Sequence, residues 1–471
     1  MAIPTLIIAD DLTGAADCAA SFVVHAADCV LWLSQPEAQA HPTRTATDGV
    51  DVVVVDTDSR RLHPAVAAKT MLATLSQYGQ GRAVFKKMDS TLRGHWATEV
   101  AALQPQLGLA LIAPAFPAMG RLVRGGHVWV HGVALAETDT WQLEHADCDA
   151  RPQAMLQAAG LQAERVALDW FDAQEGQYTD KQARAVQALR THVRAAQKRG
   201  CHALVFDCES DAHLAVLVQA VQGLRDFFWV GSGGLAQALA AQRYALQPNN
   251  EVGQPQPPLS TTAEMMGLAP LKTVRQAILT VVGSMSAVAK AQVDSMQRSC
   301  GCAVHRITAA QLYAFNVSGA HESVVPEPAS MHEHPDWLCA IAQDVRLGVD
   351  PVVTIASDDQ SDPVQGPQLA RRLAQALAGL MPEVAALVLT GGETARAVLQ
   401  PLGIARLNVL AQVEPGVVLS RGAGAHAPLI ITKAGAFGDA QSLSRAYVAL
   451  RQHLQGAMSV ATPADAASID V

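Results

Sequence analysis

Short apolar runs alternate along the chain with longer stretches in which apolar residues recur every three or four positions. Each short run predicts a buried strand, and each longer stretch predicts a helix with one apolar face. In the first half, the predicted strands cover residues 5–9, 50–55, 83–86, 109–113, 203–207 and 227–230. Strands that alternate with helices are typical of βαβ units, so we expect a largely parallel sheet. Residues 126–137 alternate with a period of two instead, which predicts a hairpin.

The same alternation resumes after a Pro-rich polar segment in the middle of the chain. Residues 247–272 show neither period, which is typical of a linker. Beyond them, strands are predicted at residues 277–282, 352–356, 386–390 and 429–432. We therefore expect an α/β fold with two lobes, whose largely parallel sheets face a cleft. The predicted parts are an N-terminal domain (1–246), the linker, a C-terminal domain (273–458) and a flexible tail (459–471).

Composition narrows the class of protein further. Half of the 471 residues are hydrophobic, which favours a folded chain over a disordered one. The 34 Lys and Arg against 43 Asp and Glu give a net charge of −9 without any basic block, so we expect no nucleic-acid partner. The chain shows neither a basic leader nor an apolar run long enough for a bilayer, and its eight cysteines are scattered. We expect a cytoplasmic protein with reduced thiols and no membrane partner.

Four strand ends in the first half concentrate carboxylates, hydroxyls and cationic groups. They lie in the loops at residues 10–14, 56–60, 86–95 and 231–234. Ligands of parallel α/β sheets bind beyond the carboxyl ends of the strands, where these loops would meet. Arginine pairs with carboxylates and Asp accepts hydrogen bonds from hydroxyls, so the mixture suits a small polyhydroxylated acid. Ordinary helix capping would explain any one of these loops alone.

Three strand ends in the second half are rich in Gly and Ser instead. They are residues 283–286, 390–394 and 433–439. Glycines let phosphate oxygens approach backbone N–H groups, and a helix N-terminus favours negative charge, so we expect nucleotide phosphate there. Plain tight turns are the alternative. A hydroxy-acid oxidoreductase would need a dinucleotide fingerprint that the chain lacks, and a non-catalytic sugar-acid sensor would need no phosphate loops.

Together these motifs resemble the four-carbon acid sugar kinases over nearly the whole chain. The matching segments are Ala9–Ala15, Lys87–Gly94, Pro114–Pro117, Gly231–Leu235, Gly391–Thr394 and Lys433–Gly438. The resemblance implies a sugar-acid-binding N-terminal domain and a nucleotide-binding C-terminal domain. It also implies phosphorylation of the 4-hydroxyl of D-threonate, D-erythronate or 3-oxo-tetronate with ATP. The Asp-rich loops offer acceptors to a C3 hydroxyl but not to a ketone, which favours a hydroxy acid over 3-oxo-tetronate. Between the two hydroxy acids, the overall resemblance favours D-threonate over D-erythronate.

The resemblance also assigns individual residues. The sugar-acid contacts would be Asp10, Asp11, Arg60, Lys87, Met88, Asp89 and Ser90, and the ATP contacts would be Ser284, Gly391, Gly392, Glu393, Thr394 and Gly435. Asp89 or Asp11 would accept the proton of the reacting alcohol, and Mg²⁺ would bridge the ATP phosphates. We assign no residue as a metal ligand. Closure of the two lobes would exclude water, and a homodimer is also considered.

Overall fold

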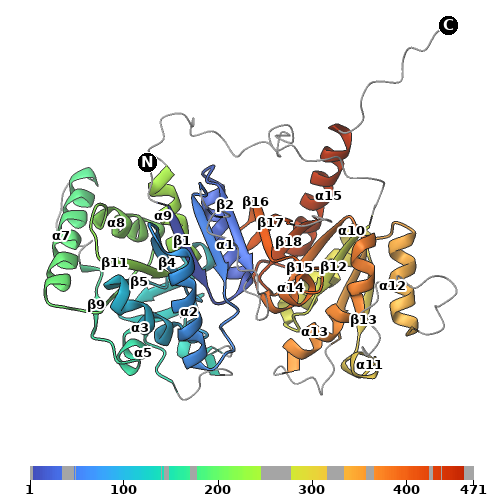
Figure 1. Ribbon diagram of the computed structural model, residues 1–471, viewed down its shortest axis with the longest axis horizontal. Coiled ribbons are helices and arrows are strands. Elements are labelled where there is room, and N and C mark those ends of the chain that lie inside the picture. Colours follow the sequence, from blue (N-terminus) through green and yellow to red (C-terminus); the bar gives the residue numbers. More distant parts are fainter. Residues whose placement is uncertain are drawn as a thin grey trace, which may run out of the picture. The chain divides into compact units, whose positions relative to one another are not determined.

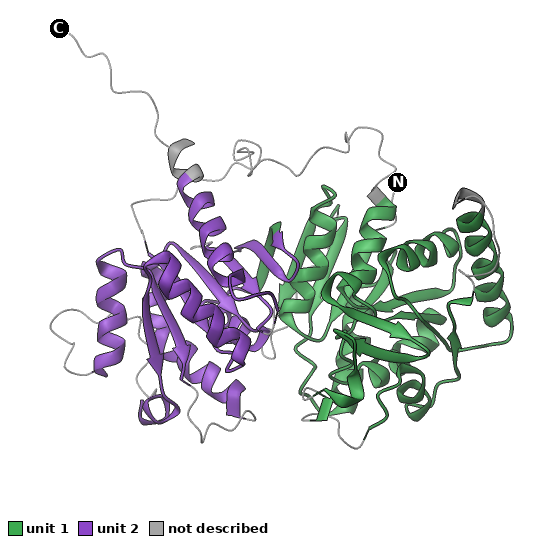
Figure 2. Cartoon of the chain, turned by 180° about the vertical axis from the view of Figure 1, so that it is seen from behind, with its two compact units in different colours: residues 1–247, 405–412 green, residues 248–404, 413–471 purple. Residues whose placement is uncertain are grey.

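Buried strands flanked by helices make up both halves of the chain (Figure 1). The computed structural model describes residues 4–33, 47, 49–138, 141–142, 148–169, 178–244, 277–315, 334–356, 365–423, 428–435 and 437–460. Contacts group residues 1–247 with 405–412 as unit 1, and residues 248–404 with 413–471 as unit 2 (Figure 2). The predicted α/β fold with largely parallel sheets is confirmed in both units. The predicted linker lies outside the described residues.

The sheet of unit 1 runs in the order β16-β2-β3-β1-β4-β11-β5-β10-β9. Its strands are β1 (Thr5–Ala9), β2 (Cys29–Leu33), β3 (Val52–Asp56), β4 (Ala83–Lys87), β5 (Leu109–Ala113), β9 (Ala163–Val166), β10 (Ala203–Phe206), β11 (Phe227–Gly231) and β16 (Arg406–Glu414). All neighbours pair in parallel except β16 and β2. Every residue of β1, β3 and β5 is buried, as expected for a parallel sheet covered on both faces.

Helices cover this sheet in two rows (Figure 1). One row contains α1 (Leu12–Val23), α9 (Gly233–Tyr244), α8 (Asp211–Ala220) and α7 (Tyr178–Lys198), and the other contains α2 (Pro64–Tyr78), α3 (Trp96–Leu107) and α5 (Pro152–Ala158). The chain moves one way along the sheet through α1 and the opposite way through α2 and α3. Right-handed crossovers therefore place α1 and α3 on opposite faces.

Two further elements of unit 1 depart from the parallel pattern. The expected hairpin is present as β7 (His127–Val130) and β8 (Val133–Ala134), which form a small antiparallel sheet with β6 (Arg121–Arg124). The edge strand β16 comes from much later in the chain. Its residue Leu407, fully buried, lies opposite Leu31 of β2, and the Arg406 guanidinium lies 5.6 Å from the ring centre of Trp32. The first sheet is thus completed by eight residues of the second half, 405–412.

The sheet of unit 2 has the order β13-β14-β12-β15-β18-β17. Its strands are β12 (Ile278–Val282), β13 (Ala303–Ile307), β14 (Pro351–Ile355), β15 (Ala386–Thr390), β17 (Val417–Gly422) and β18 (Leu429–Lys433). Only β17 pairs antiparallel with its neighbour in this set. The helices are α10 (Ala287–Cys300), α11 (Ala309–Ala314), α12 (Asp336–Arg346), α13 (Gly366–Leu377), α14 (Gly392–Leu399) and α15 (Ser442–Val460), with the 3-10 helices η2 (Pro117–Met119) and η3 (Leu135–Glu137) in unit 1 and η7 (Ala378–Glu383) in unit 2.

The described residues also bear on membrane spanning and on the state of the cysteines. No helix in the described part of the chain combines the length and the apolar character needed to cross a membrane. All eight cysteines lie among the described residues and are free, in agreement with the expected reduced thiols.

Candidate active site

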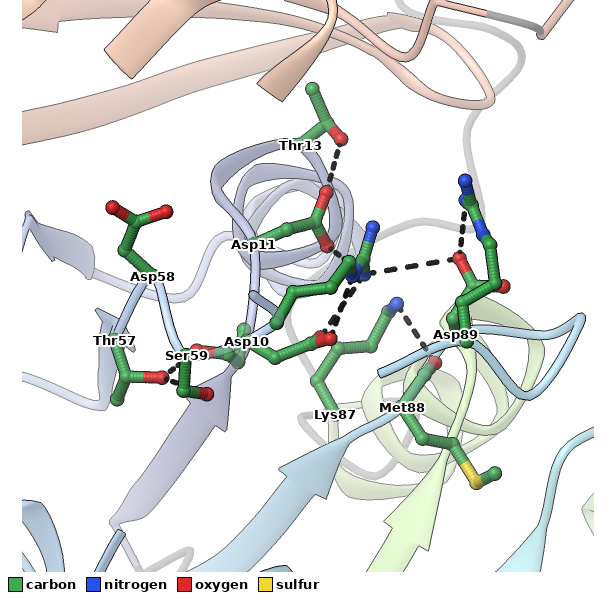
Figure 3. Close-up of polar contacts among 12 residues, drawn as sticks. Asp10, Asp11, Thr13, Thr57, Asp58, Ser59, Lys87, Met88 and Asp89 are labelled. Carbon is green, nitrogen blue, oxygen red and sulfur yellow. Dashed lines mark hydrogen bonds and ion pairs between the residues drawn. The ribbon is translucent and has the colours of Figure 1, made fainter. Parts of the chain in front are cut away.

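Four neighbouring strands of unit 1 bring the polar loops predicted from the sequence to one edge of the sheet. The order β3-β1-β4-β11 is continuous, and the pairing is in register, with Ala9 opposite Asp56 and Gly231 opposite Lys87. All four strands are parallel, so their carboxyl ends point the same way. The loops after them therefore lie at one edge of the sheet, and side chains from the loops after β1, β3 and β4 gather in one place (Figure 3).

Arg60 approaches three carboxylates of this cluster, those of Asp10, Asp11 and Asp89. Its Nε donates to Asp10 Oδ2 at 2.7 Å, and its Nη2 donates to Asp10 Oδ1 at 3.1 Å and to Asp11 Oδ1 at 2.8 Å. The same Nη2 lies 3.8 Å from Asp89 Oδ2. One guanidinium thus joins carboxylates from the ends of β1 and β4, and planar forked donors are suited to that task.

Asp89 is fixed within its own loop as well. Its Oδ1 accepts hydrogen bonds from the Thr91 N–H at 2.9 Å and from the Thr91 hydroxyl, and its Oδ2 accepts one from Arg93 Nη2 at 2.7 Å. Ser90 is buried beside it. Arg93 was not among the predicted site residues, although it lies within the matching segment Lys87–Gly94. A cationic residue in the same strand-end loop as Asp89 is the signal that could have identified it.

Lys87 lies close to Gly14 in the first turn of α1, as Asp11 does. Its Nζ donates to the Met88 carbonyl at 2.9 Å, and a Cβ atom at Gly14 would lie 2.8 Å from this Nζ and 2.6 Å from Asp11 Oδ1. At position 14, in the first turn of α1, a residue larger than glycine would therefore displace both side chains. Met88 is fully buried, and its N–H donates to the Gly231 carbonyl at 2.8 Å. Its contribution here is the backbone, which joins the ends of β4 and β11.

The charges of the cluster stabilise one another. Burial alone would raise the pKa of Asp10, but Arg60, Lys86 and Lys87 outweigh it and lower the pKa to about 2. Burial opposes the ionised form of Asp89 in the same way, and Arg93, Arg60 and Lys87 still place its pKa well below the usual range. These carboxylates are therefore anionic at neutral pH, so both oxygens of each can accept hydrogen bonds from hydroxyl groups.

The pKa values of the cationic groups Arg60 and Lys87 are raised. Burial lowers the pKa of Arg60, but the surrounding carboxylates raise it well above its ordinary value. Burial likewise disfavours the charge on Lys87, whereas Cys18, Asp11, Asp89 and Asp10 raise its pKa. The cluster thus keeps its positive charges at any physiological pH.

In unit 2, the three Gly- and Ser-rich loops also converge. They follow the neighbouring strands β12, β15 and β18, whose last residues are in register, with Val282 opposite Thr390 and Thr390 opposite Lys433. A Cβ atom at Gly435 would lie 3.0 Å from Ser284 Cβ, 3.1 Å from Ser284 Oγ and 3.7 Å from Gly391 Cα. The three loops therefore approach one another through small residues.

Helix α14 begins beside these loops. Gly391 caps the helix with φ +90°, a conformation that favours glycine, and Gly392 begins it. Glu393 lies in the first turn, and the buried Thr394 has its Oγ1 against Gly283, where a Cβ would lie 2.0 Å away. Small loops beside a helix N-terminus fit a nucleotide phosphate, because backbone N–H groups can then approach its oxygens.

Lys433 adds a cationic group that was not predicted as a site residue. It ends β18 two residues before Gly435, is fully buried, and donates from Nζ to the Ala434 carbonyl at 2.8 Å. Burial lowers its pKa to about 8, against the opposing effect of Glu414. A lysine beside glycine-rich loops is the signal that could have identified it.

Comparisons with known proteins match the two halves of the chain to two different domain families. Residues 5–239 match the family described as a sugar-binding N-terminal domain, and residues 279–443 match a nucleotide-binding C-terminal domain. A D-threonate kinase of Cupriavidus necator is 38% identical to this chain, covering 95% of it and 98% of the relative. The chain belongs to the four-carbon acid sugar kinase family. The family resemblance inferred from the sequence motifs is confirmed.

Other four-carbon acid sugar kinases and solved structures are more distant. A 3-oxo-tetronate kinase of Methylobacterium radiotolerans is 28% identical, covering 93% of this chain and 97% of the relative. A solved structure from Salmonella typhimurium LT2 has a TM-score of 0.69 at 22% identity and covers 94% of this chain and 98% of its own. At that identity the structural similarity supports the fold alone.

The charge cluster predicts how stability depends on pH. Because the pKa of Asp10 in the folded chain lies below its ordinary value of 3.8, the ionised carboxylate stabilises the fold above about pH 4, and this contribution is lost as the pH falls toward 2. A shift of this size corresponds to about 2 kcal/mol. We expect Asp10→Asn to lower stability at pH 6 and to flatten the loss of stability between pH 5 and pH 2.

Chemical denaturation at pH 6, 4 and 2.5 would measure this effect, with Asp211→Asn, an exposed carboxylate of α8, as the matched control. The control should follow the wild type at each pH. An Asp10→Asn curve parallel to the wild type would contradict the assignment.

Proposed function

We propose that this chain is an ATP-dependent kinase that phosphorylates the 4-hydroxyl of D-threonate, giving 4-phospho-D-threonate and ADP. The observation that carries the proposal is the 38% identity to a D-threonate kinase over 95% of the chain. The placement of matching motifs at the strand ends of both units supports it. D-erythronate and 3-oxo-tetronate are the alternative acceptors.

The cluster in unit 1 has the chemistry that a sugar acid requires. Arg60 and Lys87 retain their positive charge and can attract the substrate carboxylate, while Asp10, Asp11 and Asp89 can accept hydrogen bonds from its hydroxyls. A ketone at C3 would present a second acceptor to these carboxylates, and an unmatched pair of acceptors is costly in a desolvated site. This arrangement favours a 3-hydroxy acid over 3-oxo-tetronate.

Phosphoryl transfer requires the 4-hydroxyl to lose its proton as the new bond forms. Asp89 and Asp11 are the candidate acceptors, and each lies at a strand end with partners that fix its orientation. Because transfer of this kind passes through a loose transition state, orienting the hydroxyl matters more than the strength of the base. A carboxylate of low pKa such as Asp89 can therefore serve.

The residues of unit 2 fit the nucleotide. Ser284, Gly391, Gly392, Glu393, Thr394 and Gly435 would bind ATP, whose chemistry supplies the phosphoryl group. The Lys433 ammonium lies in the same strand-end region and would contribute positive charge. We propose Mg²⁺ as the counter-ion of the phosphates, since hard oxygen ligands suit it. We assign it no protein ligand, and activity should disappear on chelation with EDTA.

We also propose a cytoplasmic location, two functional domains and a homodimer. A cytoplasmic location accords with free cysteines, and the domain limits at 1–246 and 273–458 describe the two functional parts. A homodimer can be tested by light scattering during gel filtration.

An assay of ADP release tests the proposed function. The purified chain would be supplied with ATP, Mg²⁺ and each of D-threonate, D-erythronate and 3-oxo-tetronate. The highest kcat/KM should be obtained with D-threonate. A clear preference for 3-oxo-tetronate would contradict the acceptor argument, and no turnover with any of the three would contradict the kinase itself.

Asp89→Asn should reduce kcat by at least about 100-fold, because the loop would lose both its proton acceptor and its charge partner for Arg93. ATP binding, which we place in unit 2, should remain within about twofold of the wild type by calorimetry. Equal losses of turnover and ATP affinity would contradict the assignment of Asp89 to the sugar acid. Asp11→Asn, measured in parallel, compares the two candidate proton acceptors.

Gly435→Ala should weaken ATP binding by about tenfold or more. The new methyl group would lie about 3 Å from Ser284 and would narrow the space through which phosphate oxygens reach the backbone. The KM for D-threonate, measured at saturating ATP, is the internal control and should stay unchanged. A folded variant with wild-type ATP affinity would show that this loop does not bind phosphate.

A further inference from the structure

A buried ion pair connects the polar strand ends of unit 1 to α3. The side chains of Lys86 and Glu99 are both fully buried, and Lys86 Nζ lies 2.8 Å from Glu99 Oε2. The other carboxylate oxygen, Oε1, accepts a hydrogen bond from Ser59 Oγ at 2.6 Å. One carboxylate from α3 therefore binds strand β4 through one oxygen and the loop after β3 through the other.

The same network extends to a third strand. Ser59 Oγ lies 3.0 Å from Thr57 Oγ1, and Thr57 Oγ1 donates to the Ala9 carbonyl at the end of β1 at 2.8 Å. Lys86 Nζ also donates to the Lys87 carbonyl at 2.5 Å. The single proton of each hydroxyl is thus donated outward, from Ser59 to Glu99 and from Thr57 to Ala9, and the two hydroxyl oxygens are in contact. Glu99 binds β4 and the loop after β3 directly, and the same loop is bonded to the end of β1 through Thr57.

Each anchor of this network directly precedes a residue of the proposed sugar-acid site. Ala9 precedes Asp10, Ser59 precedes Arg60 and Lys86 precedes Lys87. Successive residues of a strand point to opposite faces, so Lys86 faces α3 while Lys87 faces α1. Fixing Ala9, Ser59 and Lys86 therefore restrains the backbone from which Asp10, Arg60 and Lys87 project.

Stability alone is a weak explanation for such a pair. Burying two charges costs desolvation, and apolar residues of similar volume often stabilise a core as well or better. Apolar residues could not donate to Lys87 or accept from Ser59, however. The geometry points to Glu99 as a positioning residue that acts through Ser59 and Lys86 to hold Arg60 and Lys87 in the arrangement that binds the sugar acid. This inference rests on the proposed function.

Ser59→Ala is the sharpest test, because it removes one hydrogen bond and leaves the Lys86–Glu99 ion pair intact. The matched control is Ser21→Ala, a buried serine of α1 whose hydroxyl donates to the Asp17 carbonyl at 3.0 Å, away from the network. We expect Ser59→Ala to raise the KM and the calorimetric Kd of D-threonate at least tenfold. The KM of ATP should stay within twofold, and Ser21→Ala should match the wild type in both.

Glu99→Gln extends the test, since it keeps an acceptor for Ser59 but removes the charge that faces Lys86. It should weaken D-threonate binding at least as much as Ser59→Ala does, and thermal denaturation would confirm that both variants are folded. Folded Ser59→Ala with the D-threonate affinity of Ser21→Ala would overturn the positioning role while leaving the kinase proposal intact. A wild type that neither binds nor phosphorylates a four-carbon acid would overturn both.

Discussion

The site of unit 1 depends on one interaction, the contact of the Arg60 guanidinium with carboxylates from two strand ends. Arg60 contacts both Asp10 and Asp11 through a forked geometry that a lysine lacks. The low pKa of Asp10 and the high pKa of Arg60 are two results of this contact. Two further cations lie in the same cluster. Lys87 donates to the Met88 carbonyl, and Arg93 pairs with Asp89.

The two units carry different chemical groups at the same part of a parallel sheet. In unit 1, the strand ends carry charged side chains, which suit a small acid with hydroxyl groups. In unit 2, they carry glycines and a helix N-terminus, which offer backbone N–H groups to phosphate. The difference lies in the loops, since both sheets place consecutive strand ends in register. Strand β16 completes the sheet of unit 1, although it comes from the second half of the chain.

Sequence periodicity predicted the buried parallel strands, such as β5 and β15, because their residues are apolar on both faces. It missed β9 and β13, which carry charged residues, and β16, whose pairing partner β2 lies hundreds of residues earlier. Strands β2 and β17 were also missed. The site loops followed from residue type and strand position. The contacts of Arg93 and Glu99 did not, because Arg93 lies in an irregular loop without periodicity and Glu99 reaches the strand ends through the packing of a helix.

Calorimetric titration of Arg60→Lys with D-threonate, in the absence of ATP, tests the central claim most directly. Lysine keeps the positive charge but cannot contact Asp10 and Asp11 with a fork of donors, so binding that depends on this geometry should weaken at least about tenfold. Arg124→Lys, an exposed partner of Glu209, is the control and should bind as the wild type does. Wild-type affinity in Arg60→Lys would contradict the account, since charge alone would then suffice.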